Sequence, residues 1–344
     1  MTDQEVTPTT RHHALAGLPL AAVALIWMAA MLWSARSTIT GGADAEMEVT
    51  STAYALPGAI SASLVAGAAA GLAVLALLSG RRRFSATDEA QLSRRGTGAS
   101  IRFAIATGTG LAIGLLGAAT MVTINTDGWL YAVVGGTVAA AGTIGGALAG
   151  LREPRVVAAV CWAAIGVFVV GFVLSLFQDP VLHLLGSGRT DASRAHAARW
   201  FTFCQSVLSG LAAGLISYAV LRRARRRAGA DLSWPRYALA GAGPGLLLVL
   251  GEGLTRTAGA RVLDLAGKVS ELELTVQRML SGARFNSALI VLFVGAISAV
   301  IAVGRTMGPA RPAGEAGDED PAGDGPGAAQ TSSSSSETAY HSSS

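Results

Sequence analysis

The chain has little charge, few aromatic side chains and almost no cysteine. Of its 344 residues, 14% are charged, 6% are aromatic and two are cysteine. Soluble globular domains are about a quarter charged, so a single soluble domain is excluded. Cys161 and Cys204 both fall within apolar stretches, which indicates small buried side chains and excludes a disulfide framework. Lys268 is the single lysine among 26 basic residues, and with the abundant Ala, Gly and Val this indicates a G+C-rich bacterial genome.

The sequence also lacks the short motifs that mark common enzyme and metal sites. It contains no HExxH, no GxSxG, no P-loop and no GxGxxG at a strand-to-helix turn. Hydrolase, kinase and nucleotide-driven pump activities therefore have no support, and we expect no cofactor. His12, His13, Met28 and Met31 supply no complete ligand set, so we expect no metal. The arginines lie in short runs between apolar segments, where they orient a membrane protein, so we expect no nucleic acid.

Long apolar stretches dominate what is present. A helix that crosses a bilayer needs about 20 mostly apolar residues, and eight stretches of that kind occur. The sequence therefore predicts an all-α integral membrane protein with eight transmembrane helices, whose main partner is the lipid bilayer. The predicted spans are residues 14–34, 54–79, 101–124, 129–150, 156–177, 200–221, 236–256 and 283–304.

Arginine is unevenly distributed over the connections between these spans. It collects after the second, fourth and sixth spans, so these three connections lie on one side of the membrane. The positive-inside rule makes that side cytoplasmic, which predicts a multi-pass protein of a bacterial inner membrane with both termini in the cytoplasm. Residues 1–13 are then a cytoplasmic N-terminal segment. Residues 307–344 are rich in Gly, Pro, Ser and acidic residues, and we predict a disordered cytoplasmic tail.

Two pairs of spans resemble each other. The segment SLVAGAAAGLAVLALL from Ser63 and the segment SVLSGLAAGLISYAVL from Ser206 share eight residues without a gap, and arginines follow both. The next spans match more weakly, from Arg102 and from Arg236. Self-similarity of this kind predicts a parallel four-plus-four repeat, with residues 14–150 as the first half and 151–306 as the second.

Glycines four residues apart recur in three spans. Such pairs place both glycines on one helix face, where another helix backbone can approach closely. Because a bundle of eight spans needs many close contacts, packing within the chain is favoured over dimerisation. The predicted packing pairs are Gly67 with Gly71, Gly210 with Gly214, and Gly142 with Gly146.

Four polar or helix-disturbing residues are candidates for a substrate pathway. Glu252 is the clearest charge within a span, but Arg256 follows four residues later, so an ion pair at the headgroup level is favoured over a proton or cation site facing the repeat interface. Gln205 fits an interhelical hydrogen bond and a cavity-lining role equally well. Pro244 should break or kink the seventh span, and Asn125 is polar near the outer end of the third.

The outer connection after the seventh span carries apolar residues in alternating steps of three and four. This heptad pattern predicts an amphipathic helix over about 258–280, for which the first half has no equivalent. It is a candidate surface for a membrane-protein partner or a second copy. The residues that would form this surface are Leu265, Val269, Leu272 and Val276.

Three classes of function remain open. The favoured one is a permease-like transport protein that translocates a lipid or small molecule without strong ion coupling, because ion coupling needs a titratable or cation-binding group at depth. The alternative is a nonenzymatic accessory or scaffold subunit of an envelope or transport complex. A membrane enzyme that uses outer-loop residues ranks last, and no catalytic residue is assigned.

Overall fold

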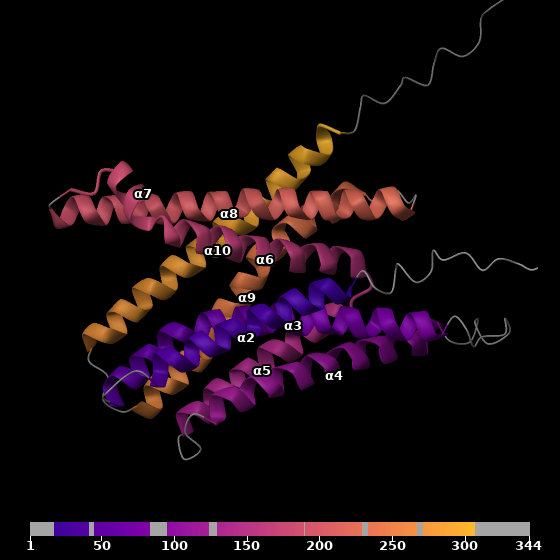
Figure 1. Ribbon diagram of the computed structural model, residues 1–344, viewed down its shortest axis with the longest axis horizontal. Coiled ribbons are helices and arrows are strands. Elements are labelled where there is room, and N and C mark those ends of the chain that lie inside the picture. Colours follow the sequence, from indigo (N-terminus) through magenta and orange to yellow (C-terminus); the bar gives the residue numbers. More distant parts are fainter. Residues whose placement is uncertain are drawn as a thin grey trace, which may run out of the picture. The chain divides into compact units, whose positions relative to one another are not determined.

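The computed structural model describes residues 17–40, 45–82, 95–123, 129–188, 190–228, 233–266 and 271–306. Within these ranges the chain forms nine helices and no strand (Figure 1). They are α2 (Leu18–Thr40), α3 (Ala45–Arg82), α4 (Arg95–Val122), α5 (Trp129–Ala149), α6 (Pro154–Leu176), α7 (Gln178–Leu184), α8 (Asp191–Ala228), α9 (Trp234–Ala266) and α10 (Glu271–Gly304).

Eight of these helices are long and apolar enough to span a membrane, which confirms the predicted number. The largest difference in bounds is in the sixth span, because the stretch before residue 200 continues the helix back to Asp191. The chain is a multi-pass helical membrane protein. The predicted segment 1–13 and tail 307–344 lie outside the described residues. The apolar segments are Leu18–Thr38, Ala55–Ser79, Gly98–Val122, Tyr131–Ala149, Pro154–Leu176, Asp191–Arg226, Trp234–Thr257 and Met279–Gly304.

Glycine allows the helices of the first half to pack closely. Helix α5 contacts both α3 and α4 extensively. A Cβ atom added to Gly146 would lie only 2.7 Å from the Cα of Gly110, and one on Gly142 would lie 2.7 Å from the Cα of Gly114. On α3, a Cβ on Gly67 would overlap the backbone of Gly142. Without a hydrophobic force between helices in lipid, such close contacts hold the bundle together.

The second half has similar glycine contacts. Helix α10 packs on both α8 and α9. A Cβ on Gly210 of α8 would lie 2.7 Å from the Cβ of Val294, and one on Gly214 would lie 2.7 Å from the Cβ of Ser298. In the first half, a Cβ on Gly71 would likewise lie 2.9 Å from a side chain of α5. All six glycines singled out in the sequence therefore lie at helix contacts within the chain.

The two predicted halves meet mainly through α9, which packs on α3 and α5, and through α6, which packs on α3. In α9, a Cβ on Gly251 would lie 3.3 Å from the hydroxyl oxygen of Ser61. The rings of Trp27 in α2 and Phe168 in α6 also contact each other, with centroids 4.8 Å apart. Both halves thus belong to one unit, residues 1–306.

Apolar side chains cover much of the surface of the bundle. Ile26, Leu116 and Phe293 are 68%, 65% and 59% exposed. In water such exposure would favour aggregation, whereas in a bilayer these side chains contact lipid. The surface therefore agrees with the membrane assignment.

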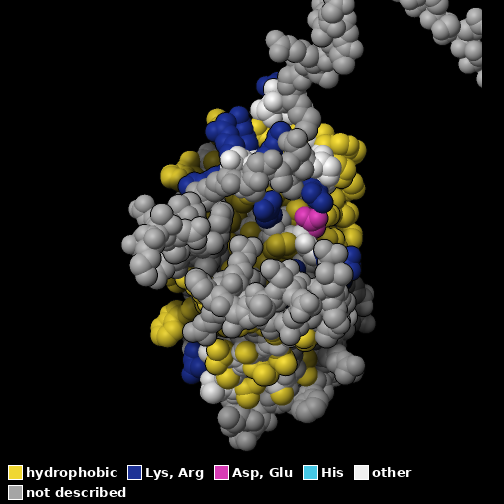
Figure 2. Space-filling view, turned by 90° about the vertical axis from the view of Figure 1, so that its right-hand side faces the viewer, with side chains coloured by type: hydrophobic (Ala, Val, Ile, Leu, Met, Phe, Trp, Pro, Cys, Tyr) yellow, Lys and Arg dark blue, Asp and Glu magenta, His cyan; other side chains and the backbone are white. Residues whose placement is uncertain are grey.

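Basic side chains gather at one end of the bundle, which we call the arginine-rich end. Figure 2 looks onto the end where α8 finishes and shows Lys and Arg side chains together with an acidic one. At this end Arg236, near the start of α9, pairs with Glu153, just before α6, at 2.9 Å. The described arginines here include Arg152, Arg155, Arg222, Arg223, Arg225 and Arg226.

Candidate functional site

Glu252 is a buried carboxylate in the membrane-spanning part of α9. It is 5% exposed and lies about 24 Å along the helix from Arg236, at 1.5 Å per residue. This places it near the end opposite the arginine-rich end. Because a charge removed from water is costly unless it is paired and hydrogen-bonded, its surroundings decide what it can do.

Three side chains donate to this carboxylate. Arg256, one turn later in α9, approaches Oε1 with its Nε at 3.3 Å. Arg284 of α10 approaches Oε2 with its Nε at 3.0 Å. The hydroxyl of Ser281, also in α10, donates to Oε1. We call Glu252, Arg256, Ser281 and Arg284 the Glu252 cluster.

Further contacts tie Arg256 to α10. Its Nε donates to the hydroxyl oxygen of Ser281 at 2.8 Å, and its Nη2 donates to the carbonyl oxygen of Ser281 at 3.2 Å. Its guanidinium carbon lies 5.0 Å from the ring centroid of Phe285, a cation–π distance. The Glu252 cluster therefore links α9 and α10 toward the end of the bundle opposite the arginine-rich end.

The composition of the Glu252 cluster restricts its chemistry. Two arginines face one carboxylate, so the formal charge is one positive unit, and both carboxylate oxygens accept hydrogen bonds from arginine. The side chains of Arg256 and Arg284 are 48% and 35% exposed, so the positive charge reaches the surface. The arrangement suits helix linkage or contact with an anion better than it suits a bound cation.

The sequence predicted the pair of Glu252 with Arg256 but missed the contribution of α10. Ser281 and Arg284 are 29 and 32 residues away, and sequence spacing alone does not bring them to Glu252. Their signal was a serine and an arginine three residues apart, at the start of the last apolar stretch. All contacts described for the Glu252 carboxylate come from α9 and α10, while the neighbouring Gly251 faces α3.

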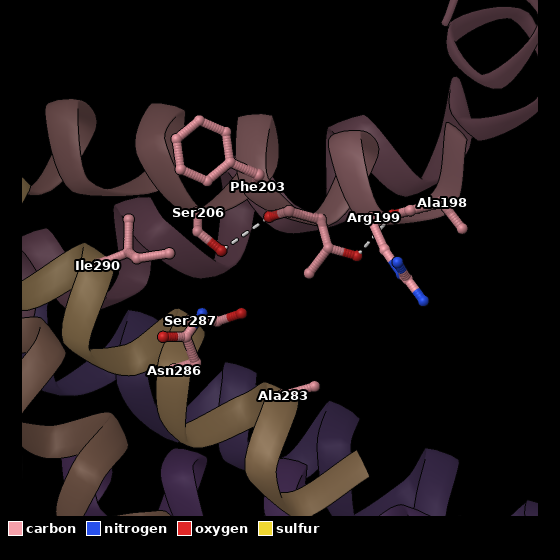
Figure 3. A pocket seen from close by; sticks show the side chains of 9 residues that line it. Ala198, Arg199, Phe203, Ser206, Ala283, Asn286, Ser287 and Ile290 are labelled. Carbon is pink, nitrogen blue, oxygen red and sulfur yellow. Dashed lines mark hydrogen bonds between the residues drawn. The ribbon is translucent and has the colours of Figure 1, made fainter. Parts of the chain in front are cut away.

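A cavity of about 350 Å³ lies between α8 and α10, on another face of α10 (Figure 3). On α10 its lining residues follow steps of three, one and three, so they occupy one side of the helix. The α10 residues of the Glu252 cluster, Ser281 and Arg284, are not part of this lining. The lining consists of Ala198, Arg199, Thr202, Phe203 and Ser206 from α8 and Ala283, Asn286, Ser287 and Ile290 from α10.

The polar groups of this cavity differ in how they are engaged. The hydroxyls of Thr202 and Ser206 donate to carbonyl oxygens one turn earlier in α8, at 3.0 and 2.8 Å, as is usual for such residues in a helix. Figure 3 shows Arg199 on α8 and Asn286 and Ser287 on α10 directed toward the space between the helices. The cavity is therefore amphipathic, with a cation and amide and hydroxyl groups beside apolar side chains.

The other predicted pathway residues lie apart from both features. Gln205 faces α6, because a Cβ on Gly171 would lie 3.3 Å from its Nε2. Pro244 is fully buried and α9 continues through it, so the span is not broken there, and the alternative of a kink stays a prediction. Neighbouring helices can compensate the backbone groups that a proline leaves unpaired. Asn125 lies outside the described residues.

The outer partner surface remains a prediction. The backbone is helical over most of the predicted segment, as the end of α9, which finishes at Ala266, and the start of α10 at Glu271. Residues 267–270, including Val269, lie outside the described residues. The side chains of Leu265, Leu272 and Val276 are not among the described ones either, so their contacts do not enter the argument.

Among the side chains that the structure describes, no three His, Cys, Asp or Glu residues are grouped so that they would hold a metal ion. No protein-family model, curated protein or solved structure matches this chain. What the fold defines is the class, a multi-pass helical membrane protein.

Proposed function

We propose that this protein is a permease-like protein of a bacterial inner membrane that moves a lipid or small amphiphile without strong ion coupling. The cavity between α8 and α10 is the observation that carries the proposal. The cavity has both polar and apolar lining residues. Elsewhere in the bundle, helix backbones pack directly against each other at glycines. Ligand sites often lie between the helices of a bundle.

The state of Glu252 supports the absence of ion coupling. Transport driven by protons or cations relies on a titratable or cation-binding group within the membrane. The carboxylate of Glu252 is instead engaged by two arginines and one serine. A cation that approached it would have to displace an arginine and would meet the positive charge of the second.

The proposed four-plus-four repeat has partial support from the helix contacts. In each half the fourth span packs on the second and third, and glycines of the second span contact the fourth. The contact between halves does not follow this symmetry, because α9, the third span of its half, packs on α3 and α5, the second and fourth spans of theirs. A duplicated four-helix unit with a diverged interface accounts for both observations.

The proposal is tested by reconstituting the full chain into phosphatidylcholine vesicles that carry a trace of fluorescent phosphatidylglycerol. Dithionite bleaches label in the outer leaflet, so bleaching that continues into the inner-leaflet pool reports movement. We expect this second phase with protein and not with protein-free vesicles, and we expect the same rate with and without proton or sodium gradients. Absence of the second phase, or its dependence on a gradient, would overturn the proposal.

The helical extensions beyond the membrane favour the second candidate, an accessory subunit. Helix α9 continues about 14 Å beyond Thr257, and α10 begins about 12 Å before Met279, at 1.5 Å per residue. These extensions offer a partner surface outside the bilayer. Extraction in native membrane discs followed by mass spectrometry separates the candidates: a stoichiometric protein partner that is lost on changing Leu272 supports the subunit, and a retained lipid without a protein supports the carrier.

A further inference from the structure

The cavity between α8 and α10 has hydrogen-bond donors and a cation but no acidic group in its lining. Among the described residues, no carboxylate lies within ion-pair distance of Arg199, whereas Arg194, Arg256 and Arg284 each contact one. The hydroxyl protons of Thr202 and Ser206 are used by their own helix. The groups left to meet a ligand are thus the Arg199 guanidinium, the Asn286 amide and the Ser287 hydroxyl, a set that favours an anionic acceptor.

Two observations place this cavity at the level of the lipid headgroups. Arg199 lies about 35 Å along α8 from Arg222 at the arginine-rich end, and the hydrocarbon core of a bilayer is about 30 Å thick. The next residue, Trp200, is 48% exposed, and tryptophan favours the headgroup layer. In a helix that crosses the membrane, Arg199 therefore reaches the headgroups of the leaflet opposite the arginine-rich end.

Apolar surface continues from the cavity toward the middle of the bilayer. Ile290 is the last lining residue on α10, and Phe293 and Ile297 follow it at steps of three and seven, on the same side of the helix. These two side chains are 59% and 58% exposed. Within the cavity, Phe203 and Ile290 are themselves apolar. A ligand with an anionic head at Arg199 could thus rest an acyl chain along α10.

We propose that the cavity between α8 and α10 binds the phosphate of an anionic membrane lipid, with Arg199 as its charged contact and Asn286 and Ser287 as further donors. The lipid site supplies a ligand class for the proposed function. It depends on that function only in so far as the bound lipid is also moved across the membrane. Binding itself is an independent property, because the cavity, its charge and its depth are present whether or not the lipid crosses the membrane.

The test is retention of lipid by the full-length protein in discs made of equal parts phosphatidylcholine and phosphatidylglycerol. After release into detergent, native mass spectrometry counts the lipids that remain bound. The wild type should retain phosphatidylglycerol in preference to phosphatidylcholine, and Arg199→Gln should lower that preference about tenfold, as expected for loss of a charge-assisted hydrogen bond. The matched control is Arg194→Gln, which removes an arginine of the same helix that lies outside the cavity and already pairs with Asp191.

A second variant keeps the charge and removes the space. Ala283→Phe places a ring in the cavity and should also abolish the preference, while Gly282→Phe, at a neighbouring position with no atom within 4 Å of its added Cβ, should not. Equal losses in the Arg199 and Arg194 variants would overturn the proposal, because they would indicate general surface attraction. Displacement of the lipid by soluble glycerol phosphate would also overturn it, because the site would then recognise a free anion.

The outcomes separate this proposal from the proposed function. If the protein retains phosphatidylglycerol through Arg199 but shows no second phase of dithionite bleaching, the lipid site is supported and the carrier is refuted. Lipid movement together with a phosphatidylglycerol preference that Arg199→Gln and Ala283→Phe leave unchanged refutes the lipid site and keeps the carrier.

Discussion

Removing the charge of Glu252 should destabilise the contact between α9 and α10. In Glu252→Gln the neutral amide can still accept one hydrogen bond, but Arg256 and Arg284 lose their shared countercharge. Removing one partner of a buried ion pair costs about 3–5 kcal/mol, and a pair at the surface is worth about 0–1 kcal/mol. Because the carboxylate is buried and the two arginines are 48% and 35% exposed, we expect an intermediate loss of about 2 kcal/mol.

The assay is thermal unfolding of the purified protein in discs of one lipid composition. At about 2–4 °C per kcal/mol for a large domain, Glu252→Gln should lower Tm by roughly 4–8 °C. Arg284→Gln should cost less, because Arg256 still neutralises the carboxylate. The variant that carries both Glu252→Gln and Arg284→Gln should lose about 1–2 kcal/mol less stability than the two single losses added together.

The reasoning fails if the two single losses add within about 0.5 kcal/mol, since independent sites behave in that way. The control is Arg194→Gln, whose partner Asp191 is fully exposed, and it should leave Tm unchanged. Membrane abundance of every variant is measured in parallel. Normal abundance of Glu252→Gln together with loss of lipid movement would instead assign the carboxylate to the transport pathway.

Two further predictions concern packing and topology. Gly146→Ala should lower the free energy of unfolding by about 1–3 kcal/mol, because its Cβ would lie 2.7 Å from the Cα of Gly110, and Tm and membrane abundance should fall with it. Gly108→Ala has open space at its Cβ and should leave both unchanged. In whole cells, an impermeant thiol reagent should label a cysteine placed at position 272 and not one at position 96, and the reverse labelling would refute the predicted orientation.

Apolar length was enough to predict the number of membrane spans. A span needs about 20 apolar residues whatever its neighbours are, so eight such stretches predicted eight helices. The helix that contains the sixth span is longer than the predicted span 200–221, because the amphipathic stretch before residue 200 continues it back to Asp191. For Pro244 the sequence left a break and a kink open, and α9 passes through it without a break.

The candidate sites were only partly predictable. Glu252 and Arg256 lie one helical turn apart, so their pairing follows from local geometry. The contributions of Ser281 and Arg284 depend on how α10 docks against α9, and the cavity depends on how the same helix docks against α8. Neither arrangement follows from the periodicity of a single segment.

The sequence by itself thus determined which segments enter the membrane and which residues can pair within one helix, because the bilayer imposes a length and the helix imposes a period. The tertiary structure decided which faces meet. Helix contacts in lipid depend on the close fit of small residues such as Gly110 and Gly146, and this fit exists only after two distant helices are side by side. In the same way, docking of α10 against α9 gave Glu252 its second arginine, and docking of α10 against α8 left Arg199 facing a cavity.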